Sequence, residues 1–95
     1  MRKYEVMYIV RPDVEQDVLE ATAEKFNSII TTGGGEITKH EVLGKRRLAY
    51  EIKKFRDGYY VVTQFTADSS VVNELDRVMK ITDEIIRHLI VRDVA

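Results

Sequence analysis

The sequence contains no cysteine and no long apolar run. Without cysteine the chain has no disulfide bond, thiolate zinc site or cysteine nucleophile, which fits a reducing cytosol. No run approaches the roughly 18 apolar residues of a membrane helix, and the start, MRKYEVMYIV, lacks the features of a secretory signal. We therefore expect a cytoplasmic protein that packing alone stabilises.

Signals of catalysis or metal binding are also scarce. His40 and His88 are the only histidines, they lie on different predicted strands, and neither has a carboxylate at a metal-binding spacing. Ser69 and Ser70 lack a neighbouring base and are better explained as helix caps. The glycines at 33–35 follow a predicted helix, whereas phosphate loops place glycines before one. We expect no catalytic residue, metal site or cofactor.

The composition fits one folded domain over residues 1–95, because 44% of the residues are hydrophobic and 33% are charged. The formal net charge of -1 argues mildly against a nucleic-acid partner. However, residues 12–36 carry six acids against one lysine, a balance of -5, and residues 37–60 carry seven cations against three acids, a balance of +4. A local basic surface is therefore compatible with the sequence.

The first third of the chain predicts a strand followed by a helix. Residues 4–10, YEVMYIV, are β-branched or aromatic at nearly every position, as in a central strand. Asp13 and Gln16 have the spacing of a helix N-cap and its reciprocal partner. Apolar residues then recur every three or four positions over residues 14–30, which predicts an amphipathic helix that the glycines at 33–35 end.

The middle of the chain predicts a β-hairpin. Residues 36–54 have an extended pattern with an irregularity at Gly44, and form one long strand or two short ones. Asp57 and Gly58 predict a turn, and residues 59–67 predict a further strand.

The last third predicts a helix and a closing strand. Ser69 or Ser70 is a candidate N-cap for a helix through Met79, and residues 84–92 predict the final strand. The resulting βαββαβ order predicts an α+β ferredoxin-like sandwich, a four-stranded antiparallel sheet with two helices on one face. The other face has nothing in the chain to cover it, so Met7 and Ile9 mark either a contact surface or scattered exposed residues.

A basic cluster is the remaining candidate site. Lys45, Arg46 and Arg47 are consecutive, and further cations lie in the same predicted hairpin. Several cations that converge on a polyanion, with aromatic residues nearby, are typical of RNA binding. The residues alone leave three alternatives: RNA contact, a solvated edge strand whose cations discourage aggregation, or an anionic small molecule.

The segment GKRRLAYEIK, residues 44–53, resembles the signature of the bacterial small-subunit ribosomal protein S6 family. The opening MRKYEVMYIVRP and the predicted strand DGYYVVTQF are also similar to that family, and the resemblance covers essentially the whole chain. It implies a ferredoxin-like fold and a non-catalytic ribosomal role: binding small-subunit ribosomal RNA together with ribosomal protein S18 and supporting the platform of the subunit. It implies no cofactor, membrane or small-molecule substrate.

The resemblance also implies which residues contact RNA or the protein partner, without dividing them between the two. The candidates are the basic residues Arg2, Lys3, Lys45, Arg46, Arg47, Lys53, Lys54 and Arg56. Leu48, Ala49 and Tyr50 are expected to pack and to hold the basic strand in register, with the Tyr50 hydroxyl able to reach a polar neighbour. Many members of the family carry a tail beyond the position of Ala95.

Two other classes of function use the same fold. An acylphosphatase-like hydrolase would hold a phosphoryl group with arginine and backbone amides, and Arg11 is the arginine to test. The acids in RPDVEQD, residues 11–17, would however repel a phosphate. A metabolite-binding regulatory module would pair two sheets and therefore form a homodimer.

Overall fold

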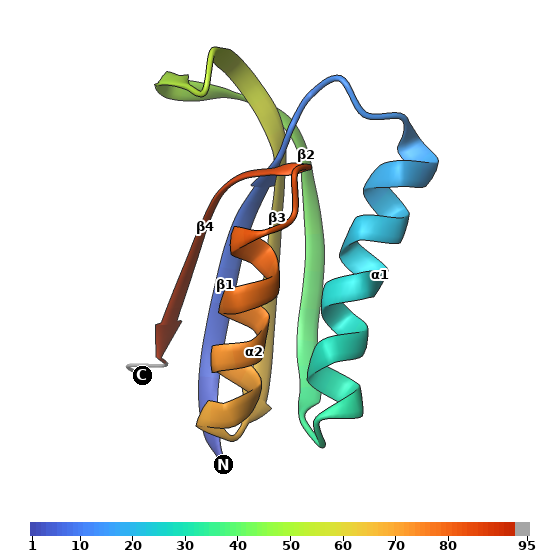
Figure 1. Ribbon diagram of the computed structural model, residues 1–95, viewed down its shortest axis with the longest axis vertical. Helices are drawn as coiled ribbons and strands as arrows, with labels where there is room; N and C mark the ends of the chain where they lie inside the picture. Colours follow the sequence, from blue (N-terminus) through green and yellow to red (C-terminus); the bar gives the residue numbers. More distant parts are fainter. Residues whose placement is uncertain (93–95) are drawn as a thin grey trace.

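A computed structural model describes residues 1–92 of the chain (Figure 1). Its elements follow the order β1 (Arg2–Val10), α1 (Gln16–Thr32), β2 (Glu36–Ile52), β3 (Phe55–Ala67), α2 (Ser69–Lys80) and β4 (Ile85–Arg92). Neither helix in this part of the chain has the length and apolarity that crossing a membrane requires. The expected βαββαβ order is confirmed, and residues 36–52 form one long strand.

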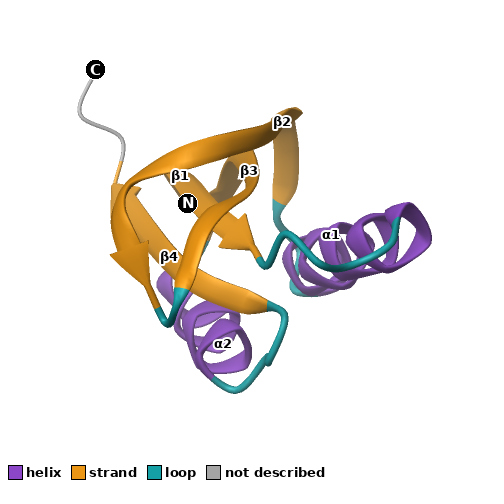
Figure 2. Ribbon diagram, turned by 90° about the horizontal axis from the view of Figure 1, so that it is seen from above, coloured by secondary structure: helices purple, strands orange, loops and turns teal. Residues whose placement is uncertain are grey.

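The four strands form one sheet in the order β2-β3-β1-β4, and every neighbouring pair is antiparallel. The strand at residues 4–10 is therefore central, as its apolar sequence predicts. Both helices lie on the same face of the sheet, which is clearest when the molecule is seen from above (Figure 2). The predicted ferredoxin-like architecture is confirmed.

The main core lies between this face and the helices. Val6, Tyr8 and Val10 alternate along β1 and are at most 1% exposed, because side chains two apart on a strand share a face. Phe26 of α1 and Leu75 of α2 are buried against them, and Tyr8 meets Phe26 edge to face at 5.2 Å between ring centroids. The helical periodicity in the sequence thus identifies the buried side of each helix.

The predicted helix N-caps are wrong. Helix α1 begins after Glu15, and the carboxylate of Asp13 instead accepts hydrogen bonds from Arg11 at 2.8 and 3.0 Å. Helix α2 begins after Asp68, so Ser69 and Ser70 lie inside its first turn, and neither N-cap residue makes a side-chain capping bond. The Asp13 carboxylate bonds the Arg11 guanidinium because a hydrogen bond from a charged donor is stronger than one from a backbone amide at the helix start.

The hairpin is confirmed, but its turn is at Lys53 and Lys54 rather than at Asp57 and Gly58. Ile52 pairs with Phe55 across a two-residue turn in which both lysines have positive φ, 49° and 71°. Gly58 lies within β3, where a Cβ atom would approach Ile9 Cγ2 to 2.4 Å. The glycine is required by this close approach, not by a turn.

The irregularity predicted at Gly44 is present. The pairing of β2 with β3 shifts between Val42 and Gly44, and Gly44 has a φ of 91°, in the region that glycine adopts most easily. At the end of α1, Gly34 has a similar φ of 87°. The predicted end of that helix is therefore confirmed.

The open face of the sheet is partly covered, contrary to the expectation that nothing in the chain covers it. Beyond Gly44 the hairpin bends over the beginning of β4, at the upper left of Figure 1. Leu48 of β2 is buried against Ile9 and Ile86, and Ile52, Phe55 and Tyr60 pack around these three residues. Ile9 is consequently 4% exposed. Met7, two residues earlier, remains half-buried on the uncovered part of this face.

Candidate nucleic-acid interface

The eight predicted contact residues separate into two groups. Six of them, which we call the hairpin cations, lie on the β2–β3 hairpin: Lys45, Arg46, Arg47, Lys53, Lys54 and Arg56. Arg2 and Lys3 lie at the opposite end of the sheet, where Lys3 pairs with Thr66, while Arg46 pairs with Gly58. Eight residues of β3 separate these partners, or roughly 27 Å of strand. The structure therefore brings six of the eight together.

The middle of the hairpin brings four of these cations around one depression. Lys45, Arg46 and Arg47 are exposed, lie opposite Tyr59, Gly58 and Asp57 of β3, and line a shallow depression with Arg56 and Asp57. The Lys45 ammonium lies 5.7 Å from the centroid of the Tyr59 ring, within cation–π range.

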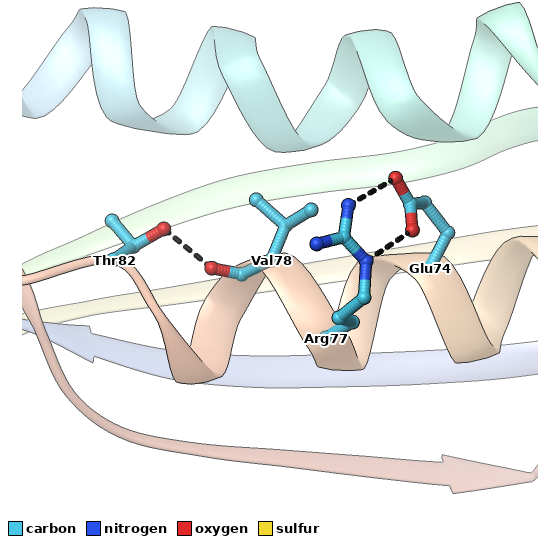
Figure 3. A network of polar contacts seen from close by, with 4 residues as sticks. All are labelled: Glu74, Arg77, Val78 and Thr82. Atoms are coloured by element: carbon cyan, nitrogen blue, oxygen red, sulfur yellow. Dashed lines mark hydrogen bonds and ion pairs between the residues drawn. The ribbon is translucent and has the colours of Figure 1, made fainter.

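Most of the hairpin cations have no acidic partner. Of these six cations only Arg56 lies within ion-pair distance of a carboxylate of residues 1–92, with 3.7 Å between its Nε and Glu51 Oε1. The helix surface differs, because there Arg77 donates two hydrogen bonds of 2.8 Å to Glu74 (Figure 3). That contact holds the pKa of Glu74 below its usual range. The positive charge of the hairpin is left available to an external anion.

The turn of the hairpin adds strain to this arrangement. Two successive positive φ values are the geometry that Asn-Gly occupies in tight hairpins, because a Cβ atom disfavours them. Lysine occupies both positions here, and both lysines are exposed. Backbone strain of this kind is characteristic of positions retained for function.

Sequence reasoning missed Arg87. It lies on β4, and its guanidinium donates a hydrogen bond to the hydroxyl of Tyr50 and lies 6.0 Å from the ring centroid. Thirty-seven residues separate the two in sequence, so only the folded register brings them together. Tyr50 thus reaches a polar neighbour as predicted, but it is 61% exposed. Of the three residues expected to pack, Leu48 is buried, whereas Ala49 and Tyr50 are exposed.

Arg11, the arginine of the hydrolase alternative, is already engaged. Its guanidinium is bonded to both carboxylate oxygens of Asp13 and lies 5.4 Å from the ring centroid of Phe55. The hydrogen bond from Arg11 holds the pKa of Asp13 below its usual range. A phosphoryl group would have to displace this carboxylate, which weighs against that alternative.

Three comparisons relate the chain to known proteins. The family model described as ribosomal protein S6 matches residues 3–92. The small ribosomal subunit protein bS6 of Desulforamulus reducens is 54% identical over 98% of this chain and 98% of that protein. Its counterpart in Moorella thermoacetica is 48% identical over 97% of this chain and 94% of that protein.

A solved structure of similar fold carries the same family name. The crystal structure of 30S ribosomal protein S6 from Thermotoga maritima superposes with a TM-score of 0.92 at 40% sequence identity. The match covers 97% of this chain and 87% of that chain.

Proposed function

Because the chain belongs to the ribosomal protein S6 family, we propose that it binds small-subunit (16S) ribosomal RNA together with ribosomal protein S18 and supports assembly of the platform. Membership makes it a component of the small ribosomal subunit, in the bacterial cytoplasm. Its role there is non-catalytic: it holds RNA and a protein neighbour in a fixed relation. This proposal extends to Arg2 and Lys3 as separate contacts at the far end of the sheet.

One observation carries the proposal: the hairpin gathers six cations, of which only Arg56 has a carboxylate within ion-pair distance in the described part of the chain. A surface that only needs solubility usually mixes charges of both signs. Arginine pairs at adjacent positions offer bidentate donors for phosphate oxygens. The hairpin therefore has the chemistry of a phosphate-contacting element.

The overall charge supports a shared RNA site. A net charge of -1 is unusual for a protein that binds RNA alone, and the acidic residues concentrate between positions 12 and 36. A partner that contributes most of the cations would leave this chain to supply only the hairpin contacts. A one-to-one complex with ribosomal protein S18 meets that requirement.

The RNA part of the proposal is tested by neutralising Arg46 and Arg47 together, as Arg46→Gln and Arg47→Gln, in the presence of ribosomal protein S18. Binding to a small-subunit ribosomal RNA fragment is measured over a series of salt concentrations. Each lost phosphate contact lowers the slope of log affinity against log salt by about 0.7 to 0.9. We expect weaker binding and a shallower slope.

The matched control removes the same charge from the helix face, as Arg77→Gln and Lys80→Gln. Both residues are exposed and bonded to carboxylates of α2, so affinity and slope should not change. Equal effects of the two double variants would show a non-specific charge effect. An unchanged slope for the arginine variant would contradict a phosphate contact at the hairpin.

The partner and the alternative classes are tested in solution. Light scattering should give a monomer that forms a one-to-one complex when ribosomal protein S18 is added. A stable homodimer would favour the metabolite-binding class instead. Hydrolysis of an acyl phosphate that is abolished by Arg11→Ala would favour the hydrolase class.

A further inference from the structure

A small groove lies on the open face of the sheet, between the bent hairpin and β4. Its walls are mainly apolar and come from all four strands: Met7 and Ile9 on β1, Leu48 and Ile52 on β2, Tyr60 on β3, and Leu89 on β4. The volume is about 130 Å³. Pockets for drug-sized ligands measure about 300 to 1,000 Å³, so this groove accepts one flat ring at most.

Tyr50 stands at the edge of this groove in a defined position. Although 61% of the residue is exposed, Arg87 of β4 donates a hydrogen bond to its hydroxyl, and Leu48 anchors the hairpin two residues earlier. An exposed tyrosine whose hydroxyl is already bonded, on a backbone fixed by a buried neighbour, loses little conformational entropy when a ligand stacks on it. The ring is therefore prearranged as a stacking surface.

The charge around the groove selects for an anion. None of the residues that line it carries a carboxylate, and Arg87 is its one arginine or lysine. Arg87 gives one of its five N–H donors to Tyr50, and no carboxylate within residues 1–92 lies at ion-pair distance from it. Lys53 and Lys54 follow the groove residue Ile52 directly. A flat ring joined to a phosphate would fit this groove, because the ring can pack on the apolar walls and the phosphate can contact the cations beside them.

We propose that this groove holds a single unpaired nucleotide of the ribosomal RNA, whose base stacks on Tyr50 and whose phosphates contact Arg87 and the hairpin cations. The inference rests on the proposed RNA-binding function, and it specifies which kind of RNA element the hairpin recognises. Single-stranded bases stack on aromatic side chains, whereas a base inside a duplex has both faces occupied. The hairpin therefore binds a bulge, loop or junction and not a continuous helix.

The test uses the whole chain and a short single-stranded RNA that carries one fluorescent aminopurine base, whose emission falls when it stacks. Tyr50→Ala should weaken binding roughly 5- to 150-fold, the range for losing one base-stacking contact, and should abolish the quenching. The slope of affinity against salt should stay the same, because no phosphate contact is lost. Tyr50→Phe, which keeps the ring and loses the bond from Arg87, should retain the quenching.

The hairpin variant separates this inference from the proposed function. Arg46→Gln with Arg47→Gln should lower the affinity and the slope while the quenching at saturation persists. If that variant weakens binding but Tyr50→Ala does not, the RNA function stands and the nucleotide groove is refuted. If the wild-type chain does not bind the RNA with or without ribosomal protein S18, the proposed function itself fails.

Two further outcomes would overturn the nucleotide assignment. A loss of affinity for ribosomal protein S18 in Tyr50→Ala, with RNA binding unchanged, would make the groove a protein contact. Adenosine monophosphate that binds as tightly as the RNA would make it a site for free nucleotides. We expect the monophosphate to bind far more weakly, because it engages one phosphate where the RNA engages several.

Discussion

The two faces of the sheet are closed by different means. On one face, helices α1 and α2 bury a continuous core in which Tyr8, Phe26 and Leu75 are at most 1% exposed. On the other, the end of the β2–β3 hairpin covers only Ile9 and Ile86, and Leu89 is left 52% exposed. The helix-covered face provides the stability, whereas the hairpin-covered face combines a small apolar cluster with the cations and the groove.

This difference separates the residues that stabilise the fold from those proposed to contact RNA. Residues that serve the helix-covered face are apolar, regularly spaced and fully enclosed. The hairpin bends beyond Gly44, carries strained lysines at its turn, and within residues 1–92 leaves most of its cations without a carboxylate at ion-pair distance. Substitutions on the two faces should therefore have distinct effects, which the following measurements compare in order of decreasing effect.

Truncating the main core should have the largest effect. Leu75→Ala removes a residue that is 0% exposed and leaves a cavity, so the free energy of unfolding should fall by about 2 to 5 kcal/mol in urea titrations. Leu89→Ala, on the uncovered part of the other face, is the control and should change it by less than about 0.5 kcal/mol. Equal losses would contradict the assignment of stability to the helix-covered face.

Adding a methyl group beneath the hairpin should have the next largest effect. A Cβ at residue 58 would meet Ile9 Cγ2 at 2.4 Å and the Val10 carbonyl oxygen at 3.0 Å, so Gly58→Ala should destabilise by about 1 to 3 kcal/mol. Combining it with Ile9→Ala should restore part of the loss, because the shortest contact disappears. Strictly additive losses in this double-mutant cycle would show that the close approach is not the cause.

Relieving the turn should stabilise the protein by about 1 kcal/mol. Lys53→Asn with Lys54→Gly supplies the sequence that tolerates two positive φ values best. Lys53→Gln with Lys54→Gln removes the same charge and keeps the strain, so its stability should match the wild type. Both variants should bind RNA with a shallower salt dependence. A turn that gains no stability would show that the lysines are not strained.

The smallest effect should come from the acid at the edge of the helix-covered face. Asp76 of α2 lies 2.7 Å from the Nε2 of His88 and 2.9 Å from Lys80, and these bonds hold its pKa below the usual range, His88 contributing most. Because the folded pKa is the lower one, the stabilisation is present above the unfolded pKa and is lost as pH falls through the folded value. At 38% side-chain exposure it is worth at most about 1 kcal/mol.

Asp76→Asn should therefore remove part of the acid dependence of unfolding that appears below about pH 4, the unfolded pKa of aspartate. Denaturant titrations of both proteins between about pH 2 and about pH 7 compare their free energies of unfolding. This range brackets the unperturbed aspartate pKa of about 3.9. A variant whose stability declines with acid as steeply as the wild type would contradict the assignment to Asp76.

The sequence predicted the helix-covered face well because one periodic signal determines it. Leu19, Ala23, Phe26 and Ile30 recur at helical spacing, and each of them is buried. The central position of residues 4–10 followed from their nearly continuous β-branched and aromatic sequence. Local pattern and final packing agree on this face, so sequence reasoning succeeded.

The hairpin-covered face was predicted less well because its determinants are not local. Asp57 and Gly58 have the composition of a turn, yet Gly58 is needed for its contact with Ile9, nearly fifty residues earlier in the chain. The turn instead falls on Lys53 and Lys54, whose side chains gave no signal for positive φ. The Tyr50–Arg87 contact likewise depends on the register of strands that are not adjacent in the sheet.

The separation of the basic residues into two groups has an electrostatic consequence. The ionic atmosphere at physiological salt screens charges over about 8 Å, so roughly 27 Å of strand between the two groups exceeds three screening lengths. Neither group responds to the potential of the other, and the sheet keeps their spacing constant. The sheet therefore holds two charged groups at a fixed separation, and they act independently. Neutralising both groups should change the logarithm of the RNA affinity by the sum of the two separate changes.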